Sequence, residues 1–171
     1  MKRLLGCLAI GSILVATTPV LVANADPTAK KVAVAPADEY FGKMKMSILG
    51  IRNEIHDLTL KIGYEPAKAE SFLGIANQTE DALTDWERKY PDDPWIPKTL
   101  FALGRMYSVV RWSNEMNARA KRVMLFLHEH YAATWYGKQA LQEIAEGRVG
   151  KVIPTPPPAV DPPPSADTTT K

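Results

Sequence analysis

The chain has 171 residues, with 21 Lys and Arg against 19 Asp and Glu, 14 prolines and a single cysteine. These counts suit one modest domain, and they argue against a disulfide scaffold, a polytopic membrane protein and a strongly charged nucleic-acid-binding tail. Seven of the prolines lie between Pro154 and Pro164. The composition therefore describes a globular body and a separate tail.

The first 25 residues predict a secretory signal peptide. Two cations precede nineteen uncharged residues (4–22), and Ala23 and Ala25 supply the small residues of a cleavage site. We expect cleavage after Ala25, a periplasmic or secreted product, and no transmembrane segment in the mature chain. Loss of the two cations would leave 19 basic against 19 acidic residues, a net charge of zero, which disfavours nucleic acid as a partner.

Two other fates of the N-terminus stay open. The apolar run approaches the ~20 residues that span a bilayer, so an uncleaved signal anchor is one alternative. The letters Leu-Leu-Gly-Cys ending at Cys7 suggest lipidation as the other. Most of the apolar run follows Cys7, however, whereas it should end at a lipidated cysteine.

Residues 38–148 predict an all-α domain of antiparallel hairpins with about five helices. The first expected helix, 38–62, has an apolar seam with spacings of 3 and 4 residues over three heptads. The seam consists of Phe41, Met44, Ile48, Ile51, Ile55, Leu58 and Ile62. Gly63 is a stop signal, and Pro66 suits the start of the next helix. Packing of the seam within the chain and between two chains both remain possible.

Four further helices are expected at about 66–90, 95–110, 116–131 and 134–146. Their predicted core positions are Phe72, Ala76, Thr79, Leu83, Trp86 and Tyr90, then Ile96, Leu100, Leu103, Tyr107 and Val110, then Met116, Ala120, Val123, Leu127 and Tyr131, and finally Leu141 and Ile144. The helical phase breaks at residues 112–114. No alternating strand pair with a hairpin turn is recognisable.

The segments on either side of the domain predict no regular structure. Residues 26–37 contain two prolines and no sustained apolar period, so we expect a linker. Residues 149–171 are rich in proline and poor in apolar side chains, which predicts a disordered tail rich in extended polyproline II conformation. The tail could be a spacer, a proline-rich ligand for a partner, or a terminus without a role.

An internal repeat is suggested by a shift of 41 residues. The shift superposes Tyr90 on Tyr131, Leu100 on Leu141, Leu103 on Ile144 and Gly104 on Ala145. The segment 90–107, with its Leu103-Gly104-x-x-Tyr107, resembles the start of a tetratricopeptide-like repeat of the longer type found in exported bacterial proteins. The resemblance covers about residues 70–147, and Arg148 departs from it by standing where an aromatic residue is expected.

The tetratricopeptide-like resemblance implies a fold and a role. In such repeats a small residue at the position of Gly104 lets two helices approach closely, and the side chain at Tyr107 fills the space beside it. The scaffold implied binds peptides or protein surfaces in a groove lined by the first helix of each pair. The resemblance implies no catalysis.

No catalytic or metal motif is evident. His128 and His130 are two residues apart, so on a helix they point about 200° away from each other and cannot share one ion. None of the serines has a Gly-x-Ser-x-Gly context. The acidic pairs Glu80-Asp81 and Asp92-Asp93 are expected to cap helices and to face solvent. We therefore predict a protein that is not an enzyme and has neither metal nor cofactor.

Charge is segregated along the chain. Residues 65–93 contain eight acids and three bases, and residues 98–122 contain six bases and one acid. Such opposed segments favour an electrostatically steered partner or head-to-tail self-association. The alternative is that neighbouring helices of one molecule attract each other.

An aromatic and basic stripe follows from the third expected helix, because Lys98, Phe101, Arg105 and Trp112 lie on a face distinct from its core face. With Arg119, these residues are the candidate site for a partner, such as a peptide carboxylate. The alternative is that the aromatic residues pack against the first helix hairpin. The sequence thus predicts an exported interaction module of the cell envelope, with a self-assembling helical subunit as the alternative.

Overall fold

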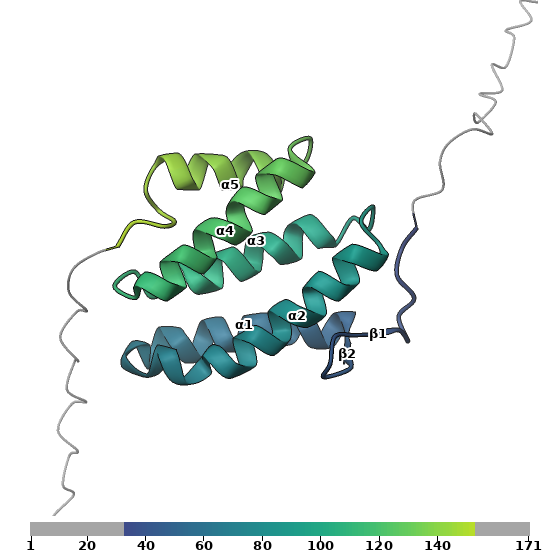
Figure 1. Cartoon of the computed structure of the whole chain (residues 1–171), viewed down its shortest axis with the longest axis horizontal. Helices are drawn as coiled ribbons and strands as arrows, with labels where there is room; N and C mark the ends of the chain where they lie inside the picture. The colour runs from purple at the N-terminus through teal and green to yellow at the C-terminus, as the bar shows by residue number, and fades with distance from the viewer. Residues whose placement is uncertain (1–32, 153–171) are drawn as a thin grey trace, which may run out of the picture. The chain divides into compact units, whose positions relative to one another are not determined.

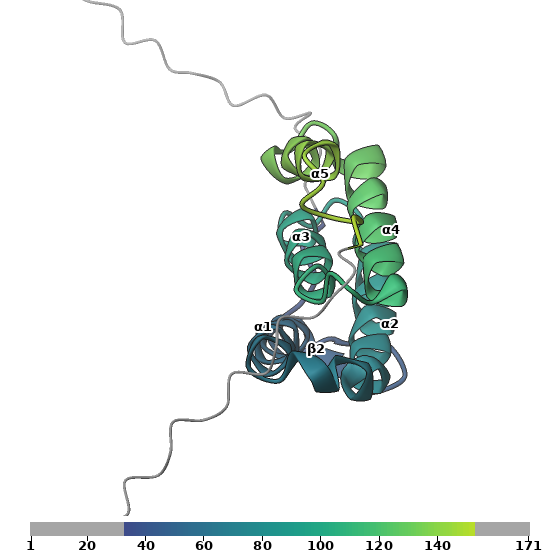
Figure 2. The same cartoon turned by 90° about the vertical axis from the view of Figure 1, so that its left-hand side faces the viewer.

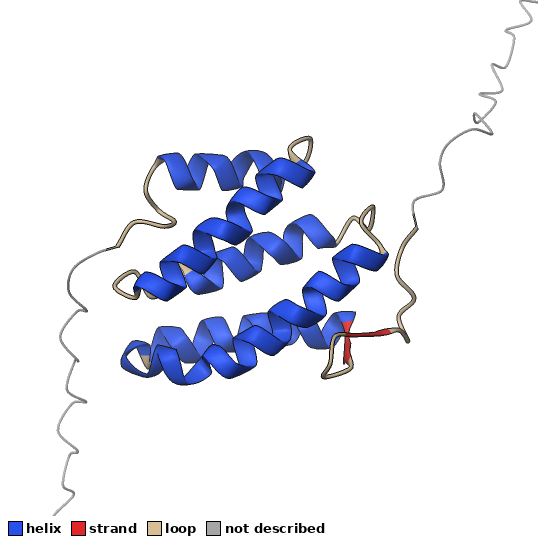
Figure 3. Cartoon of the chain, viewed as in Figure 1, coloured by secondary structure: helices blue, strands red, loops and turns tan. Residues whose placement is uncertain are grey.

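The computed structural model describes residues 33–152, so the predicted signal peptide, most of the linker and the prolines of the tail lie outside the described residues. The fold is all-α, as predicted, with one minimal strand pair (Figure 1, Figure 3). In chain order the elements are β1 (Tyr40–Phe41), β2 (Met46–Ser47), α1 (Ile48–Tyr64), the 3₁₀ helix η1 (Pro66–Phe72), α2 (Leu73–Lys89), α3 (Ile96–Tyr107), α4 (Asn114–Tyr131) and α5 (Trp135–Ala145). None of these helices combines the length and the apolar character that a bilayer crossing requires.

The helices are arranged in two layers. Figure 2 shows α1, α3 and α5 in one layer and α2 and α4 in the other, so that successive helices alternate between layers. Most of the predicted core positions are buried, including Ile51, Trp86, Leu103 and Leu127. Alternation of the layers is what an apolar stripe on each helix dictates, since every stripe needs a facing partner.

The last helix departs from its predicted core face. Leu141 was expected in the core and is 44% exposed, whereas Ala140 and Glu143 are buried. The helix α5 ends the stack and packs on α4 and α3 alone, so only part of its circumference is covered. A leucine one position from the contact stripe then remains in solvent.

The first helix begins ten residues later than predicted. The seam positions Phe41 and Met44 belong to a β-hairpin, and Met44 is 56% exposed. The helix α1 begins after Ser47, whose hydroxyl accepts a hydrogen bond from the amide of Gly50 at 3.1 Å and so caps the N-terminus. The prediction that no hairpin is present was also wrong. Its two-residue strands, with Tyr40 opposite Ser47, are too short for an alternating pattern.

The hairpin is docked on α2. Phe41 is fully buried, with its ring centroid 6.1 Å from that of Trp86. The amide of Gly42 donates to Asp85 Oδ2 at 3.0 Å, and Gly42 has a φ of +66°. A Cβ on Gly42 would lie 2.7 Å from the Cα of Ala82, so only glycine allows this approach.

We predict that Asp85 makes stability depend on pH. Hydrogen bonding from the Gly42 amide, and then from Arg88, lowers the pKa of Asp85 from its ordinary 3.8 to about 2. Because the folded pKa is the lower one, the stabilisation is complete above pH 4 and declines as the pH falls toward 2. Urea unfolding between pH 5 and pH 2 should therefore show the wild type losing its advantage over Asp85→Asn. Parallel pH profiles would contradict this role.

The second helix is divided where a single helix was predicted. Residues 66–72 form the 3₁₀ helix η1, and α2 begins only at Leu73. The amide of Lys68 donates to the carbonyl oxygen of Glu65 at 2.9 Å, three residues back, which is the hydrogen bond of a 3₁₀ helix. The predicted end near Tyr90 is confirmed, since α2 ends at Lys89.

The break predicted at residues 112–114 is the turn between α3 and α4. Ser113 caps α4 by accepting a hydrogen bond from the amide of Met116. The buried side-chain amide of Asn117 donates to the carbonyl oxygens of Arg111 and Ser113, each at 2.8 Å. One asparagine side chain therefore bonds two carbonyl groups of the turn, and that of Ser113 also accepts the backbone amide of Asn117 at 3.1 Å.

The boundaries of the linker and the tail differ from those expected. Ala35 is buried, and its amide donates to Asp93 at 3.0 Å, so the end of the predicted linker is part of the packed domain. Val149 is also buried, and its amide donates to the carbonyl oxygen of Glu143. The first residues of the predicted tail, up to Gly150, therefore belong to the packed body.

Gly104 has the packing role that the sequence suggested. It is buried, and a Cβ there would lie 2.8 Å from the Cε of Met124 on α4. The small residue lets α3 and α4 approach closely, with the buried Tyr107 one turn further on. Adding 41 to the bounds of α2 (73–89) gives 114–130, within one residue of α4.

Candidate binding face

Arg119, one of the five predicted contact residues, is engaged within the chain. Its guanidinium lies 3.5 Å from Glu80 on α2 and 2.8 Å from Glu115. Glu80 also accepts hydrogen bonds from Arg122 at 2.8 Å and from the hydroxyl of Tyr107 at 2.7 Å. Burial, and then Glu80, raise the pKa of Tyr107. The opposed charges of the sequence therefore meet between neighbouring helices, and Arg119 belongs to that contact.

Arg105 and Phe101 join α3 to α5. Arg105 makes an ion pair of 2.9 Å with Glu143, whose side chain is almost completely buried. The ring of Phe101 lies 5.9 Å from that of Trp135 and 5.8 Å from that of Tyr136. The sequence left Phe101 either on an open face or against the first hairpin, and its ring contacts are instead with α5.

Trp112 does not continue the stripe. The helix α3 ends at Tyr107, so Trp112 lies in the turn that follows, half-buried against the core. The 3 and 4 spacing that placed Trp112 with Lys98 and Arg105 applies only to a continuous helix. Of the five predicted residues, Lys98 is the one whose charge faces solvent without a carboxylate partner among residues 33–152.

Lys98 belongs to a surface that the sequence did not identify. Its Nζ lies 5.7 Å from the ring centroid of Trp95, and the guanidinium of Arg52, on α1, lies over the same ring at 4.5 Å. No ion pair within residues 33–152 involves Arg52 or Lys98. Trp95 is 43% exposed and the neighbouring Leu49 is 62% exposed. We call Leu49, Arg52, Trp95 and Lys98 the basic-aromatic face.

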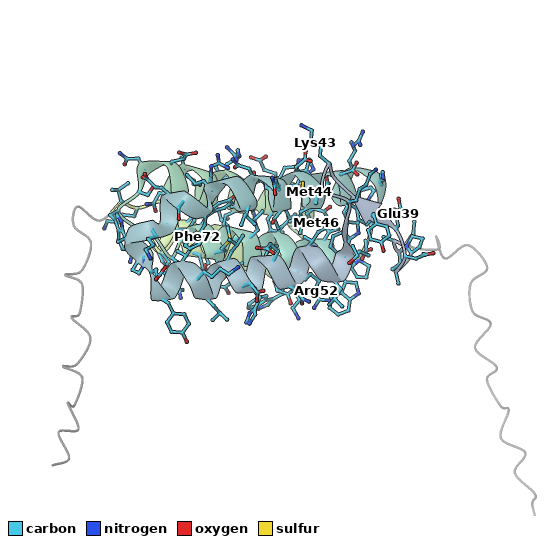
Figure 4. All side chains as sticks on the ribbon, turned by 90° about the horizontal axis from the view of Figure 1, so that it is seen from below. Glu39, Lys43, Met44, Met46, Arg52 and Phe72 are labelled. Atoms are coloured by element: carbon cyan, nitrogen blue, oxygen red, sulfur yellow. The ribbon has the colours of Figure 1, made fainter. Side chains whose placement is uncertain are left out.

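Two hollows accompany the basic-aromatic face. One, of about 290 Å³, lies between α1 and α3 and includes Arg52, Asn53, His56 and Lys98 in its lining. The other, of about 210 Å³, is bounded by Val34 and Ala37 of the N-terminal segment together with members of the face. In Figure 4, Arg52 lies at the opposite edge of the α1–α2 pair from Lys43 and Met44 of the hairpin turn.

The acidic pairs have different environments. Glu80 forms the ion pairs described above, whereas Asp93 is only 1% exposed. Its carboxylate accepts hydrogen bonds from the amide of Ala35 at 3.0 Å, the indole of Trp86 at 3.2 Å and the amide of Trp95 at 3.0 Å. No side-chain cap hydrogen bond is present at the start of α3, and Asp93 is a buried structural residue that does not solvate a surface.

The two histidines of α4 take part in local contacts. His128 Nδ1 lies 3.2 Å from the carbonyl oxygen of Gly137, and the ring of His130 is stacked on Phe126 at 4.1 Å. Within residues 33–152, no group of three or more His, Cys, Asp or Glu side chains is placed to hold a metal ion.

A larger groove of about 480 Å³ lies where the α2–α3 turn meets the α4–α5 turn. Its lining includes Pro91 and Pro94 from the α2–α3 turn, Pro97 from the start of α3, Tyr131 from the end of α4, and Trp135 and Tyr136 from the start of α5. We call these six residues the aromatic-proline groove. The hydroxyl of Tyr131 donates to Glu87 and to the carbonyl oxygen of Pro91, which ties the two turns together.

Comparison of the chain with protein-family models, with curated proteins and with solved structures gives no match. The resemblance to tetratricopeptide-like repeats therefore stays a prediction from the sequence. The proposed function therefore rests on the chemistry of the basic-aromatic face.

Proposed function

We propose that this protein is an exported, non-enzymatic interaction module of the cell envelope that binds a peptide or protein partner through the basic-aromatic face. The partner would present a carboxylate, from an acidic side chain or a chain terminus, next to an apolar group. The proposed export rests on the signal-peptide pattern of the sequence. The proposed binding rests on the face itself.

The observation that carries the proposal is the pair of cations over Trp95. Most arginines of the domain, including Arg88, Arg105, Arg119 and Arg122, already form ion pairs. Arg52 and Lys98 instead share an exposed indole, and both line the hollow between α1 and α3. Cations held beside exposed apolar area give an incoming carboxylate a charged contact and its neighbour a surface to bury.

We predict that Arg52→Glu lowers partner binding about tenfold while the helix content is unchanged. The reversal removes an attractive contact and adds a repulsive one, and Arg52 holds no ion pair whose loss would weaken the fold. The measurement is crosslinking in the native cells, followed by affinity capture and mass spectrometry. Lys98→Glu should act in the same direction.

The matched control is Lys138→Glu, which makes the same change of charge at an exposed lysine of α5. Arg105→Glu is unsuitable as a control, because it would leave the buried Glu143 beside a second carboxylate. Equal recovery of the same envelope protein by Arg52→Glu and Lys138→Glu would exclude the basic-aromatic face as the binding site. Circular dichroism of each variant separates lost binding from lost folding.

A further inference from the structure

The aromatic-proline groove is a separate surface with its own chemistry. Trp135 is 63% exposed although it begins a helix in the packed domain. Its ring stands almost perpendicular to that of Tyr136, at 87° with centroids 5.1 Å apart. Two aromatic rings set at an angle, with proline rings on the facing turn, form apolar walls that suit the flat faces of other proline rings.

The groove also has unused hydrogen-bond donors. No hydrogen bond within residues 33–152 involves the indole N–H of Trp135 or the hydroxyl of Tyr136. A proline-rich segment offers the matching groups, because its backbone has carbonyl acceptors and lacks the N–H of each proline. A ligand with many backbone N–H groups would form fewer hydrogen bonds here, because Trp135 and Tyr136 also contribute donors.

We propose that the aromatic-proline groove binds the proline-rich segment of its own chain, residues 154–164, through its last three prolines, 162–164, in an extended polyproline II conformation. The segment contains seven prolines in eleven residues. Such a conformation is largely formed before binding, so little chain entropy is lost on docking.

The segment is long enough to reach the groove. The described chain ends at Val152, beyond the C-terminal end of α5, and the groove lies near the N-terminal end of that helix. The 11 residues of α5 and the 18 of α4 correspond to lengths of ~17 Å and ~27 Å. Twelve residues, from Val152 to Pro164, extend ~37 Å as polyproline II. The chain is therefore long enough for the second group of prolines, 162–164, to reach the groove of the same molecule.

The test uses a fluorescent synthetic peptide of residues 151–164 and protein purified from its native cells. The receptor is a full-chain variant in which the seven prolines between Pro154 and Pro164 are replaced by serine, so that its own segment does not compete. We expect saturable binding in fluorescence anisotropy, and no binding of a peptide with the same serine replacements.

Three comparisons decide the proposal. Adding Trp135→Ala to the receptor should weaken peptide binding about tenfold, whereas Tyr64→Ala, at an exposed aromatic residue of α1 outside the groove, should not weaken it. Tyr136→Phe, which keeps the ring contacts, should weaken it by a smaller factor. The wild type should bind the peptide about tenfold more weakly than the receptor, because a tethered competitor acts at a millimolar effective concentration.

Other results would overturn the proposal. Absence of saturable binding to the receptor would show that the groove does not take proline-rich ligands. Equal effects of Trp135→Ala and Tyr64→Ala would place the peptide elsewhere. Equal affinity of the wild type and the receptor would show that the segment of the chain itself does not occupy the groove.

Discussion

Replacing Asp93 by alanine is expected to lower the free energy of unfolding by about 3 kcal/mol. The carboxylate of Asp93 accepts hydrogen bonds from Ala35, Trp86 and Trp95, and both Ala35 and Trp86 are buried. A buried donor that loses its acceptor costs about 1–3 kcal/mol. The cost of burying the carboxylate offsets only part of the sum, because three hydrogen bonds hold that charge in the wild type.

The expected loss is large for a domain of this size, whose stability is about 5–15 kcal/mol. Thermal and urea unfolding, followed by circular dichroism, measure it, and the midpoint temperature should fall by about 10 °C. Hydrogen exchange adds a local readout, since the amide of Ala35 should lose its protection. The matched control is Asp57→Ala, the same replacement at an exposed position of α1, for which we expect a change within about 0.5 kcal/mol. Equal effects at the two positions would refute the buried role of Asp93.

Replacing Gly137 by alanine is expected to destabilise the protein by about 3 kcal/mol. A Cβ at Gly137 would lie 2.2 Å from the carbonyl oxygen of Tyr131 and 3.1 Å from the Cα of Ala132. Both are backbone atoms of the α4–α5 turn, so no change of rotamer relieves the contact. The turn has to open, which also weakens the cap that Thr134 provides to the amide of Gly137 at 3.0 Å.

Gly74→Ala is the control for Gly137→Ala, because the same change should have the opposite sign there. Gly74 lies in α2, and a Cβ at that position meets no atom within 4 Å. Alanine in an open helical position stabilises a protein by up to about 1 kcal/mol. Urea unfolding of the two variants therefore separates steric exclusion from helix propensity. A neutral Gly137→Ala variant would mean that the turn adjusts easily.

The choice of binding residues depends on Arg52 and Lys98, neither of which forms an ion pair within residues 33–152. Arg105 lies on the same predicted stripe as Lys98, and Arg119 was added to it from the next helix, yet each has a carboxylate partner about 40 residues away in the chain. Nothing in the spacing of Arg52 and Trp95 connects them, because they lie on α1 and at the start of α3. Spacing along the sequence does not indicate which charges neighbouring helices neutralise.

The helices themselves were largely predictable because their causes are local. A period of 3.6 residues defines the buried stripe of each helix, and Ser113 and Thr134 cap α4 and α5 from positions next to them. The predicted helix boundaries were wrong where contacts with a distant residue determined the local structure. Phe41 has the spacing of a helical seam position, yet it lies in a strand because the hairpin docks on Asp85, 43 residues from Gly42.

The sequence alone therefore determined the all-α class and the approximate positions of the five helices, since both depend on neighbouring residues. The tertiary structure decided which charges are neutralised and which face solvent, because ion pairs join residues brought together only by packing. It also decided that Asp93 is buried, through a hydrogen bond to an amide 58 residues earlier. The surface left for a partner is what remains after those long-range contacts have formed.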